Sequence, residues 1–455
     1  MHFNFKYFNF THLKLAARGA LKYLLAFLTL PIVVGLVNIL TANPPQAALQ
    51  LEGAYPPAPV LALDKPTIAI VVGRDDTEIS DVIAPYVVFK SSAAFNVVTV
   101  AETRRPTRLT GGLEILPDFT FTELNQVLGR SPAVIVVPNI PDIDANAALR
   151  RWVRDHGRGS SITMSICAGA AMLAATGLLD GQRATSHWGD ILWIEGVYPQ
   201  VNWLRGLRYV DNGRTVSTAG VLSGIDGALH LIARLRGPDL ARRVASEFHY
   251  AATYLEDPTM RQLMFQPSDA IFPLNILFRW ERSVQAVALY DGVDELALSA
   301  LYDTPPPMLP SRLTSLAPAG RVVIGKFGLQ LVARRNPKDW PVTSTVLIPD
   351  APSAATPAWL RAYPTTHTLA RADQFPFDAT LGTLAQTLDV PSAVYSARRL
   401  EHRMGIELEG AGWLGAGWLG SLVVIRPLLL GALSLLIFTL LERGLARRRR
   451  SAQAP

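Results

Sequence analysis

The stretch Ser165-Ile166-Cys167-Ala168-Gly169-Ala170-Ala171-Met172-Leu173-Ala174 decides the fold, and it holds the only cysteine of the 455-residue chain. An apolar run enters it and a run of small residues leaves it, which predicts a buried strand, a sharp turn and a helix. We expect the Cys167 side chain to be strained, exposed and close to the amide donors of the helix start. Such donors lower a thiol pKa and favour a nucleophilic thiolate. A lone cysteine is also commonly a small buried hydrophobe, so both interpretations stay open here.

Outward from this turn, short apolar runs alternate with helical patterns. Strands are expected at 68–72, 97–100, 134–137 and 162–166, and helices at 79–89 and 147–154. Continuous apolar runs of this length are typical of strands that are buried on both faces. The alternation therefore predicts an α/β domain with a parallel sheet and helices on both faces.

Two apolar segments account for the high apolar content of 49%. Residues 23–41 and 420–441 are each long enough to span a bilayer, and Trp413 and Trp418 precede the second one. Basic residues gather in residues 1–22 and 442–455, beside the spans, so the net charge of +6 is weak evidence for nucleic-acid binding. The competing interpretation of the first segment is a cleaved signal peptide, and that of the second is a buried helix.

The basic flanks predict a topology in which both termini are cytoplasmic and the region between the spans is extracytoplasmic. We expect an uncleaved anchor, with a bacterial inner membrane as the location. Residues 42–65 are rich in proline, including Pro44 and Pro45, and are expected to form a semi-rigid linker. A single cysteine excludes an intramolecular disulfide and a cysteine-cluster metal site.

The soluble region contains an internal similarity. The segment that begins Ile225-Asp226-Gly227-Ala228-Leu229 matches the one that begins Phe377-Asp378-Ala379-Thr380-Leu381, and Ala245 then corresponds to Ala397. The starts also correspond, since 68–83 resembles 286–301. We therefore expect a main domain at 66–255 and a degenerate second repeat at 280–405. The second copy is too short for a cysteine turn, and we expect it to lack the middle strands.

Three motifs resemble the DJ-1/PfpI superfamily, which is part of the class I glutamine amidotransferase-like fold. They are Cys167-Ala168-Gly169-Ala170, Thr176-Gly177-Leu178-Leu179-Asp180-Gly181 and Ala184-Thr185-Ser186-His187-Trp188, with Thr218-Ala219-Gly220 further on. The most similar branch is the one fused to AraC-type regulators and found in isonitrile hydratase-like proteins. The resemblance covers about residues 66–250. It implies a flavodoxin-like sandwich with Cys167 at a nucleophile elbow.

The resemblance also implies functional residues. Asp81 matches the acidic partner of the cysteine, and the backbone amides of Ala168 and Asn139 match the positions that form an oxyanion hole. Peptidase-like members carry a histidine directly after the cysteine, where this chain has Ala168, so peptidase activity is not expected. The family's Gly-Gly after the third strand is replaced by Asn139-Ile140. An AraC-type helix-turn-helix does not follow the domain, so we expect no direct nucleic-acid binding.

Other polar residues have two interpretations each. His187 is a general base or a hydrogen-bonded histidine at a strand end. Asp81 is the cysteine partner or a surface carboxylate, whereas Glu78 on the same helix face is expected to be solvated. His249 and His402 lack metal-ligand spacing, and the glycine-rich residues 410–420 precede a span instead of a nucleotide-binding helix. We therefore predict no metal and no cofactor.

These features support three functional hypotheses. The first is a membrane-anchored module that binds an unidentified small molecule or senses oxidants at Cys167, with the repeat as a dimerisation or partner domain. The second is a cysteine-dependent hydrolase or hydratase that acts on a small carbonyl, amide or nitrile-like compound. The third is an interaction module in which the cysteine is inert. The departures from the family pattern favour the first hypothesis.

Overall fold

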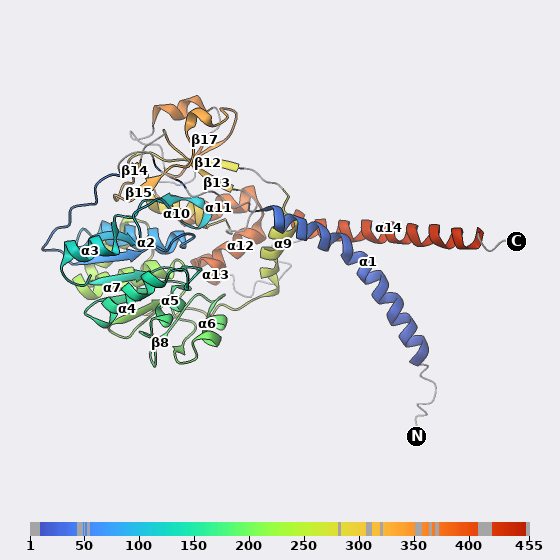
Figure 1. The fold of residues 1–455 in the computed structure, drawn as a ribbon, viewed down its shortest axis with the longest axis horizontal. Coiled ribbons are helices and arrows are strands. Elements are labelled where there is room, and N and C mark those ends of the chain that lie inside the picture. The colour runs from blue at the N-terminus through green and yellow to red at the C-terminus, as the bar shows by residue number, and fades with distance from the viewer. Residues whose placement is uncertain are drawn as a thin grey trace, which may run out of the picture.

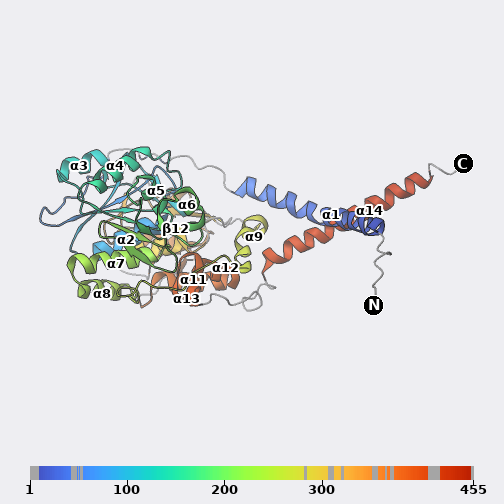
Figure 2. The same cartoon turned by 90° about the horizontal axis from the view of Figure 1, so that it is seen from below.

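The computed structural model describes residues 10–42, 49, 51, 55–280, 284–305, 312–318, 322–350, 357–363, 366–368, 373–407 and 421–451. These residues form two α/β units and two long apolar helices that extend from them (Figures 1 and 2). Pro44, Pro45, Trp413, Trp418 and the glycine-rich segment 410–420 lie outside the described residues. Residues 55–66 form neither helix nor strand.

The first unit is built on a seven-stranded sheet. Its strand order is β10-β11-β7-β6-β1-β2-β5, and β10 is the one strand that runs antiparallel to its neighbour. The strands are β1 (Thr67–Val71), β2 (Asn96–Ala101), β5 (Phe119–Thr120), β6 (Val134–Val137), β7 (Ile162–Ser165), β10 (Tyr209–Asp211) and β11 (Thr215–Thr218). The predicted α/β fold with a parallel sheet is confirmed, and its strands differ from the expected ranges by about one residue.

Helices cover both faces of this sheet because its central strands carry buried apolar side chains on both faces. In β1, Ile68 and Ile70 point to one face, and Ala69 and Val71 point to the other. The first face is covered by α2 (Ile79–Ser91), α7 (Ser223–Arg236) and α8 (Pro238–Glu247). The second face is covered by α3 (Phe121–Leu128), α4 (Ala147–Arg158), α5 (Gly169–Ala175) and α6 (Ile191–Val197). The result is a doubly wound sandwich.

The second unit has a four-stranded parallel sheet of order β13-β12-β16-β17. The strands are β12 (Val284–Ala288), β13 (Arg312–Leu316), β16 (Val346–Ile348) and β17 (Thr366–Thr368). Its helices are α10 (Glu295–Asp303), α11 (Pro376–Thr387), α12 (Val390–Arg399) and α13 (Arg403–Glu407). The expectation that 280–405 lacks middle strands is therefore wrong. Short apolar runs such as Val346–Ile348 are too brief to be recognised by periodicity alone.

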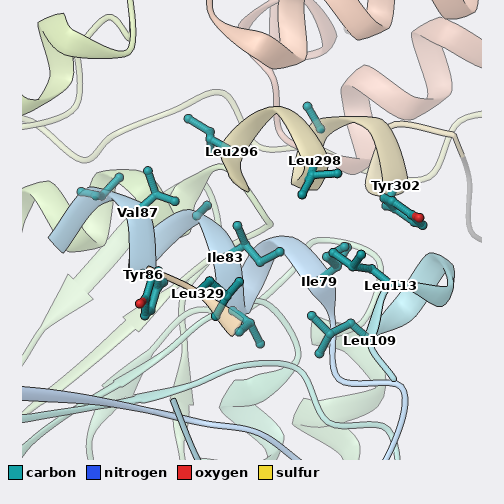
Figure 3. Packing of buried hydrophobic residues seen from close by; sticks show 14 of the residues in the cluster. Ile79, Ile83, Tyr86, Val87, Leu109, Leu113, Leu296, Leu298, Tyr302 and Leu329 are labelled. Atoms are coloured by element: carbon teal, nitrogen blue, oxygen red, sulfur yellow. The ribbon is translucent and has the colours of Figure 1, made fainter. Parts of the chain in front are cut away.

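The two units share one hydrophobic core, whose centre is α2 (Figure 3). Ile79, Ile83 and Val87 lie on this helix, and they pack together with Leu296 and Leu298 of α10. All positions of α2 from 79 to 89 are buried, because the first sheet lies on one side and the second unit on the other. A helix that is apolar all round is typical of such a central position.

A small antiparallel sheet also joins the units. Its order is β14-β15-β4-β3, with β3 (Thr107–Arg108) and β4 (Glu114–Ile115) from the first unit and β14 (Val322–Ile324) and β15 (Gln330–Val332) from the second. Arg334 forms an ion pair with the buried Glu114 beside it. Both units are thus held by backbone pairing as well as by side-chain packing.

Two helices are long and apolar enough to cross a membrane. They are α1 (Phe10–Ala42), with an apolar part at 20–41, and α14 (Leu422–Ser451). They pack closely at Gly431, where an added Cβ would lie 2.3 Å from the Phe27 ring. Their outer ends point away from the α/β units (Figures 1 and 2). Arg426 donates to the Phe278 carbonyl at 2.8 Å, at the end of α9 (Ile271–Phe278).

Helices α8 and α12 end in the same way. After α8, His249 has a φ of 54°, and Tyr250 donates its N–H to the Ala245 carbonyl at 3.0 Å. After α12, Glu401 has a φ of 53°, and His402 donates its N–H to the Ala397 carbonyl at 2.8 Å. Both ends are Schellman caps with a residue other than glycine in the left-handed position. The alignment that pairs Ala245 with Ala397 also pairs these two caps.

Candidate functional site around Cys167

Cys167 lies at the turn between β7 and α5 with a φ of 55°, in the left-handed region. The turn is possible because Gly169 approaches the end of β6, where an added Cβ would lie 2.3 Å from the Val137 carbonyl oxygen. The strained, small-residue turn that the sequence predicts is present. The side chain is only 5% exposed, however, so the expectation of an exposed cysteine is wrong.

Burial also sets the protonation of the thiol. It raises the pKa of Cys167 well above the ordinary value, and the nearby carboxylates Asp81 and Asp190 raise it further. The Ala168 amide hydrogen-bonds the sulfur and opposes this rise. The helix that follows has only seven residues, and its amides do not outweigh desolvation. In this conformation the thiol is protonated, contrary to the thiolate that the turn alone suggests.

Asp81 lies in the first turn of α2 and is completely buried. Its Oδ2 accepts the Asn139 N–H at 2.9 Å, while its Oδ1 has no hydrogen-bond partner among the described residues. Desolvation raises the pKa of Asp81 to about 8 in spite of that bond, so the carboxyl is neutral at pH 7. The structure brings Asp81 near Cys167 electrostatically, without a hydrogen bond between them in the described part of the chain. The Asn139 amide is engaged by Asp81 instead of pointing at an oxyanion.

Glu78, expected to be solvated, is buried at the N-terminal end of α2. Its Oε1 lies 3.7 Å from a terminal nitrogen of Arg399, which also pairs with Asp303 at the end of α10. Burial raises the pKa of Glu78, the Asp303 charge raises it further, and Arg399 opposes the rise. The sequence could not reveal this environment, because α10 and α12 supply the residues that cover the Glu78 carboxylate.

His187 is buried and uses both ring nitrogens. Nδ1 lies 2.9 Å from the Asp190 carboxylate, and Nε2 lies 3.0 Å from the Arg399 carbonyl oxygen. The Asp190 carboxylate and the Arg399 carbonyl are both acceptors, an arrangement that favours the imidazolium, and the Gly189 N–H at 3.3 Å from Nδ1 is a longer, opposing contact. Burial alone lowers the His187 pKa, but the hydrogen bond and charge of Asp190 outweigh it, and the pKa is raised. His187 therefore lies in the site, as an ion-pair member that joins the two units.

Cys167, His187 and Asp190 each bring one potential ligand atom within 4.8 Å of the others. This grouping is the chemical centre of the site, and it has the residue types of a cysteine–histidine–acid catalytic group or of a metal site. Both His187 nitrogens are already engaged, so metal binding would break one of two hydrogen bonds. His402, which the sequence analysis also considered as a metal ligand, forms a hydrogen bond with Asp378 and is not part of this group.

A cavity of about 320 Å³ is lined by Ser186 and Trp188, the chain neighbours of His187, whereas Cys167, His187 and Asp190 do not line it themselves. Its lining is largely apolar, with Trp188, Ile191, Leu263 and Phe265 among its walls. Ser186, which lines the cavity, donates to the Cys167 carbonyl at 2.8 Å and so connects cavity and turn. A concave apolar space with a few polar groups at one end is typical of a small-molecule site.

Comparisons with known proteins agree with this geometry. The model of the DJ-1/PfpI family matches residues 66–234. The isonitrile hydratase of Pseudomonas putida is 31% identical over 176 residues, which make up 38% of this chain and 73% of the hydratase. The chain belongs to the DJ-1/PfpI family.

This DJ-1/PfpI chain is also similar to a transcriptional regulator and to a solved structure. The HTH-type transcriptional regulator CdhR of Pseudomonas aeruginosa is 41% identical over 101 residues, 22% of this chain and 30% of the regulator. The chain thus spans less than a third of that relative. A crystal structure of a THiJ/PfpI family protein from Pseudomonas syringae has 27% identity and a TM-score of 0.37, and covers 41% of this chain and 75% of that chain.

Several residues of the DJ-1/PfpI site were missed in the sequence. Asp190 follows His187 by three positions, a spacing that could have suggested the pair. Arg399 and Glu401 come from the second unit, more than 200 positions later, and no local pattern links them to Cys167. Their position depends on how the units pack, which a single sequence does not show.

Proposed function

We propose that the chain is a membrane-anchored DJ-1/PfpI module that binds a small, largely apolar ligand beside Cys167. The observation that carries this proposal is the apolar cavity of about 320 Å³, which meets the cysteine turn through Ser186. A buried, protonated thiol next to such a cavity is suited to sensing an occupant through packing. Oxidant sensing is less well supported, because a protonated and buried thiol reacts slowly with oxidants.

The second candidate is a hydratase. It is favoured by the Cys167–His187–Asp190 grouping and by the 31% identity to an isonitrile hydratase. Hydration of an isonitrile adds one water and gives an N-substituted formamide. Three features oppose rapid turnover in the conformation seen: the raised thiol pKa, the doubly bonded His187 and the engaged Asn139 amide.

The architecture supports a tethered module. We infer that α1 and α14 form an antiparallel pair of spans with cytoplasmic outer ends, and that both α/β units are extracytoplasmic. We also infer that the second unit is a truncated copy of the first. Support comes from the order β13-β12-β16, which reproduces β2-β1-β6, and from the matched caps at His249 and Glu401. The second unit covers α2 through its helix α10.

A small alkyl isonitrile tests binding and turnover together. The full chain in detergent is titrated by calorimetry, and the formamide product is followed by mass spectrometry. Saturable binding without formamide supports the sensor, and formamide at a rate lost in Cys167→Ser supports the hydratase. Ala219→Leu, which adds three carbons at the cavity wall, should weaken binding at least tenfold. Absence of both binding and turnover would contradict the two candidates for this ligand class.

A further inference from the structure

The C-terminal end of α12 is seated on the first unit. The last carbonyls of a helix lack partners within the helix and must be satisfied elsewhere. Here four consecutive carbonyls each accept a hydrogen bond from the first unit. The donor–acceptor pairs are Trp188 Nε1 with Arg398 (3.0 Å), His187 Nε2 with Arg399 (3.0 Å), Leu222 N with Leu400 (3.1 Å) and an Arg208 terminal nitrogen with Glu401 (2.7 Å).

Glu401 anchors this contact through its side chain. Its backbone is in the left-handed region, which is strained for a residue with a side chain and unstrained for glycine. The contacts of the Glu401 side chain must therefore stabilise the fold enough to offset this strain. The carboxylate accepts a hydrogen bond from Ser223 Oγ at 2.5 Å and lies 3.8 Å from Arg208. Gly220 makes room for it, since an added Cβ there would lie 2.6 Å from the Glu401 carboxyl carbon.

The seat is the Cys167 site itself. His187, which is grouped with Cys167 and Asp190, donates to the Arg399 carbonyl. Trp188 and Glu401 both line the cavity beside the cysteine. The cysteine is 5% exposed and Glu401 is 1% exposed, and Leu400 of the α12 end belongs to the same buried cluster as Cys167. The C-terminal end of a helix carries partial negative charge, which complements the His187 imidazolium.

We propose that residues 398–402, here called the plug, are a built-in occupant of the Cys167 site, which recognises consecutive free carbonyls and one carboxylate. The thiol reacts with solutes only in the fraction of molecules in which the plug has left its seat. A docking surface of this kind fits the C-terminal end of a helix, and in this chain that helix end belongs to α12 of the second unit. The inference rests on the proposed function in one respect: both treat Cys167 as the functional group that a solute has to reach.

The single cysteine makes the test direct. Alkylation of Cys167 by iodoacetamide is followed by mass spectrometry in the full chain. Two serine-to-alanine variants form a matched pair, because each removes one buried hydrogen bond between the units. Ser223→Ala removes the bond to Glu401, whereas Ser299→Ala removes the 2.8 Å bond to Ser80, and neither of those two serines belongs to the plug. Because a hydrogen bond to a charged group is lost, Ser223→Ala should speed alkylation about tenfold, and Ser299→Ala less than about twofold.

A second variant keeps the proposal falsifiable. Glu401→Gly removes the anchor but suits the left-handed backbone, and it should speed alkylation at least as much as Ser223→Ala. The double variant should match Glu401→Gly alone, because both changes remove the same contact. Equal rates in Ser223→Ala and Ser299→Ala would overturn the plug. Isonitrile binding by the unaltered chain is measured separately, so the ligand proposal and the plug can fail independently.

Discussion

Nε2 of His187 donates a hydrogen bond to the carbonyl oxygen of Arg399 at 3.0 Å, across the boundary between the two units. The same ring is paired with Asp190 at 2.9 Å. One imidazolium thus joins the cysteine turn of the first unit to the end of α12 in the second. Its protonation state controls the stability of the interface.

The first prediction concerns this protonation. The folded pKa of His187 is raised, so its stabilising contribution is complete below the unfolded pKa of about 6.5 and is lost as the pH rises through the folded value. The melting temperature should therefore fall as the pH rises above about 6.5, and His187→Gln should reduce this dependence to the part that Asp81 contributes. His156 is a matched control, because burial lowers its pKa and its effect has the opposite sign. A pH profile unchanged in His187→Gln would contradict the imidazolium.

Asp81→Asn is expected to stabilise the chain at neutral pH. With a folded pKa of about 8, Asp81 stays protonated in the folded state at neutral pH, whereas the unfolded chain releases this proton above about pH 4. Asp81 therefore lowers the free energy of unfolding progressively as the pH rises from about 4 to about 8. The variant should gain about 1–3 kcal/mol of unfolding free energy at pH 7.5 and little at pH 4. It should also lower the pH at which alkylation of Cys167 begins, since the Asp81 charge raises the thiol pKa. Equal stability of both forms at pH 7.5 would mean that Asp81 is ionised.

Gly169→Ala should destabilise the first unit strongly. The added Cβ would meet the Val137 and Pro138 carbonyl oxygens at 2.3 and 2.5 Å, which are backbone atoms that cannot rotate away. We expect a loss of about 3 kcal/mol or more, of the size seen for overpacking in cores. Gly196→Ala in α6 is the control, because a Cβ there meets nothing within 4 Å and should be neutral or stabilising. Thermal melts should show a lowered melting temperature for Gly169→Ala and an unchanged or raised one for Gly196→Ala.

The topology is tested with reporter fusions. A reporter that is active only outside the cytoplasm should be active after residue 270 and inactive at the C-terminus. The reason is that α1 and α14 are apolar enough to span, and basic residues gather in the C-terminal turns of α14. Cytoplasmic signals at both positions would leave the two-span arrangement without support.

Separation of the units should expose α2. A fragment of residues 55–255 contains the complete seven-stranded sheet, yet it leaves the α10-facing side of α2 uncovered. We expect it to fold and to self-associate through that face, with sedimentation as the measurement. Val87→Glu, which places a charge on α2, should keep a folded fragment monomeric. A wild-type fragment that is monomeric at high concentration would show that the α10-facing side of α2 tolerates water.

Local patterns predicted the first unit well because its signals are local. Continuous apolar strands such as 134–137 and a turn built on Gly169 need no distant partner to be recognised. The second unit was predicted only in part. Its strands at 346–348 and 366–368 are short, and their neighbours in the sheet decide their structure. Propensity is weak over three residues, so tertiary pairing prevails.

The candidate site was also predicted only in part, because local patterns identify its residues but not their surroundings. Cys167, Asp81 and His187 were found in the sequence, and the structure places all three in one buried region. Their electrostatics could not be predicted. The pKa of Glu78 depends on Arg399 and Asp303, which come from the second unit. Burial reverses the sign of the pKa shift that a helix start would give to an open thiol.

The pairing of β4 with β15 has a consequence for how the chain matures. Ile115 finds its strand partner, Leu331, only after most of the polypeptide has been made. Until then the first unit carries an unpaired edge and an uncovered α2, both prone to wrong associations. Contacts so distant in sequence slow folding. We therefore expect a chain that is truncated before β15 to keep both surfaces uncovered and to self-associate, even where its first unit is folded.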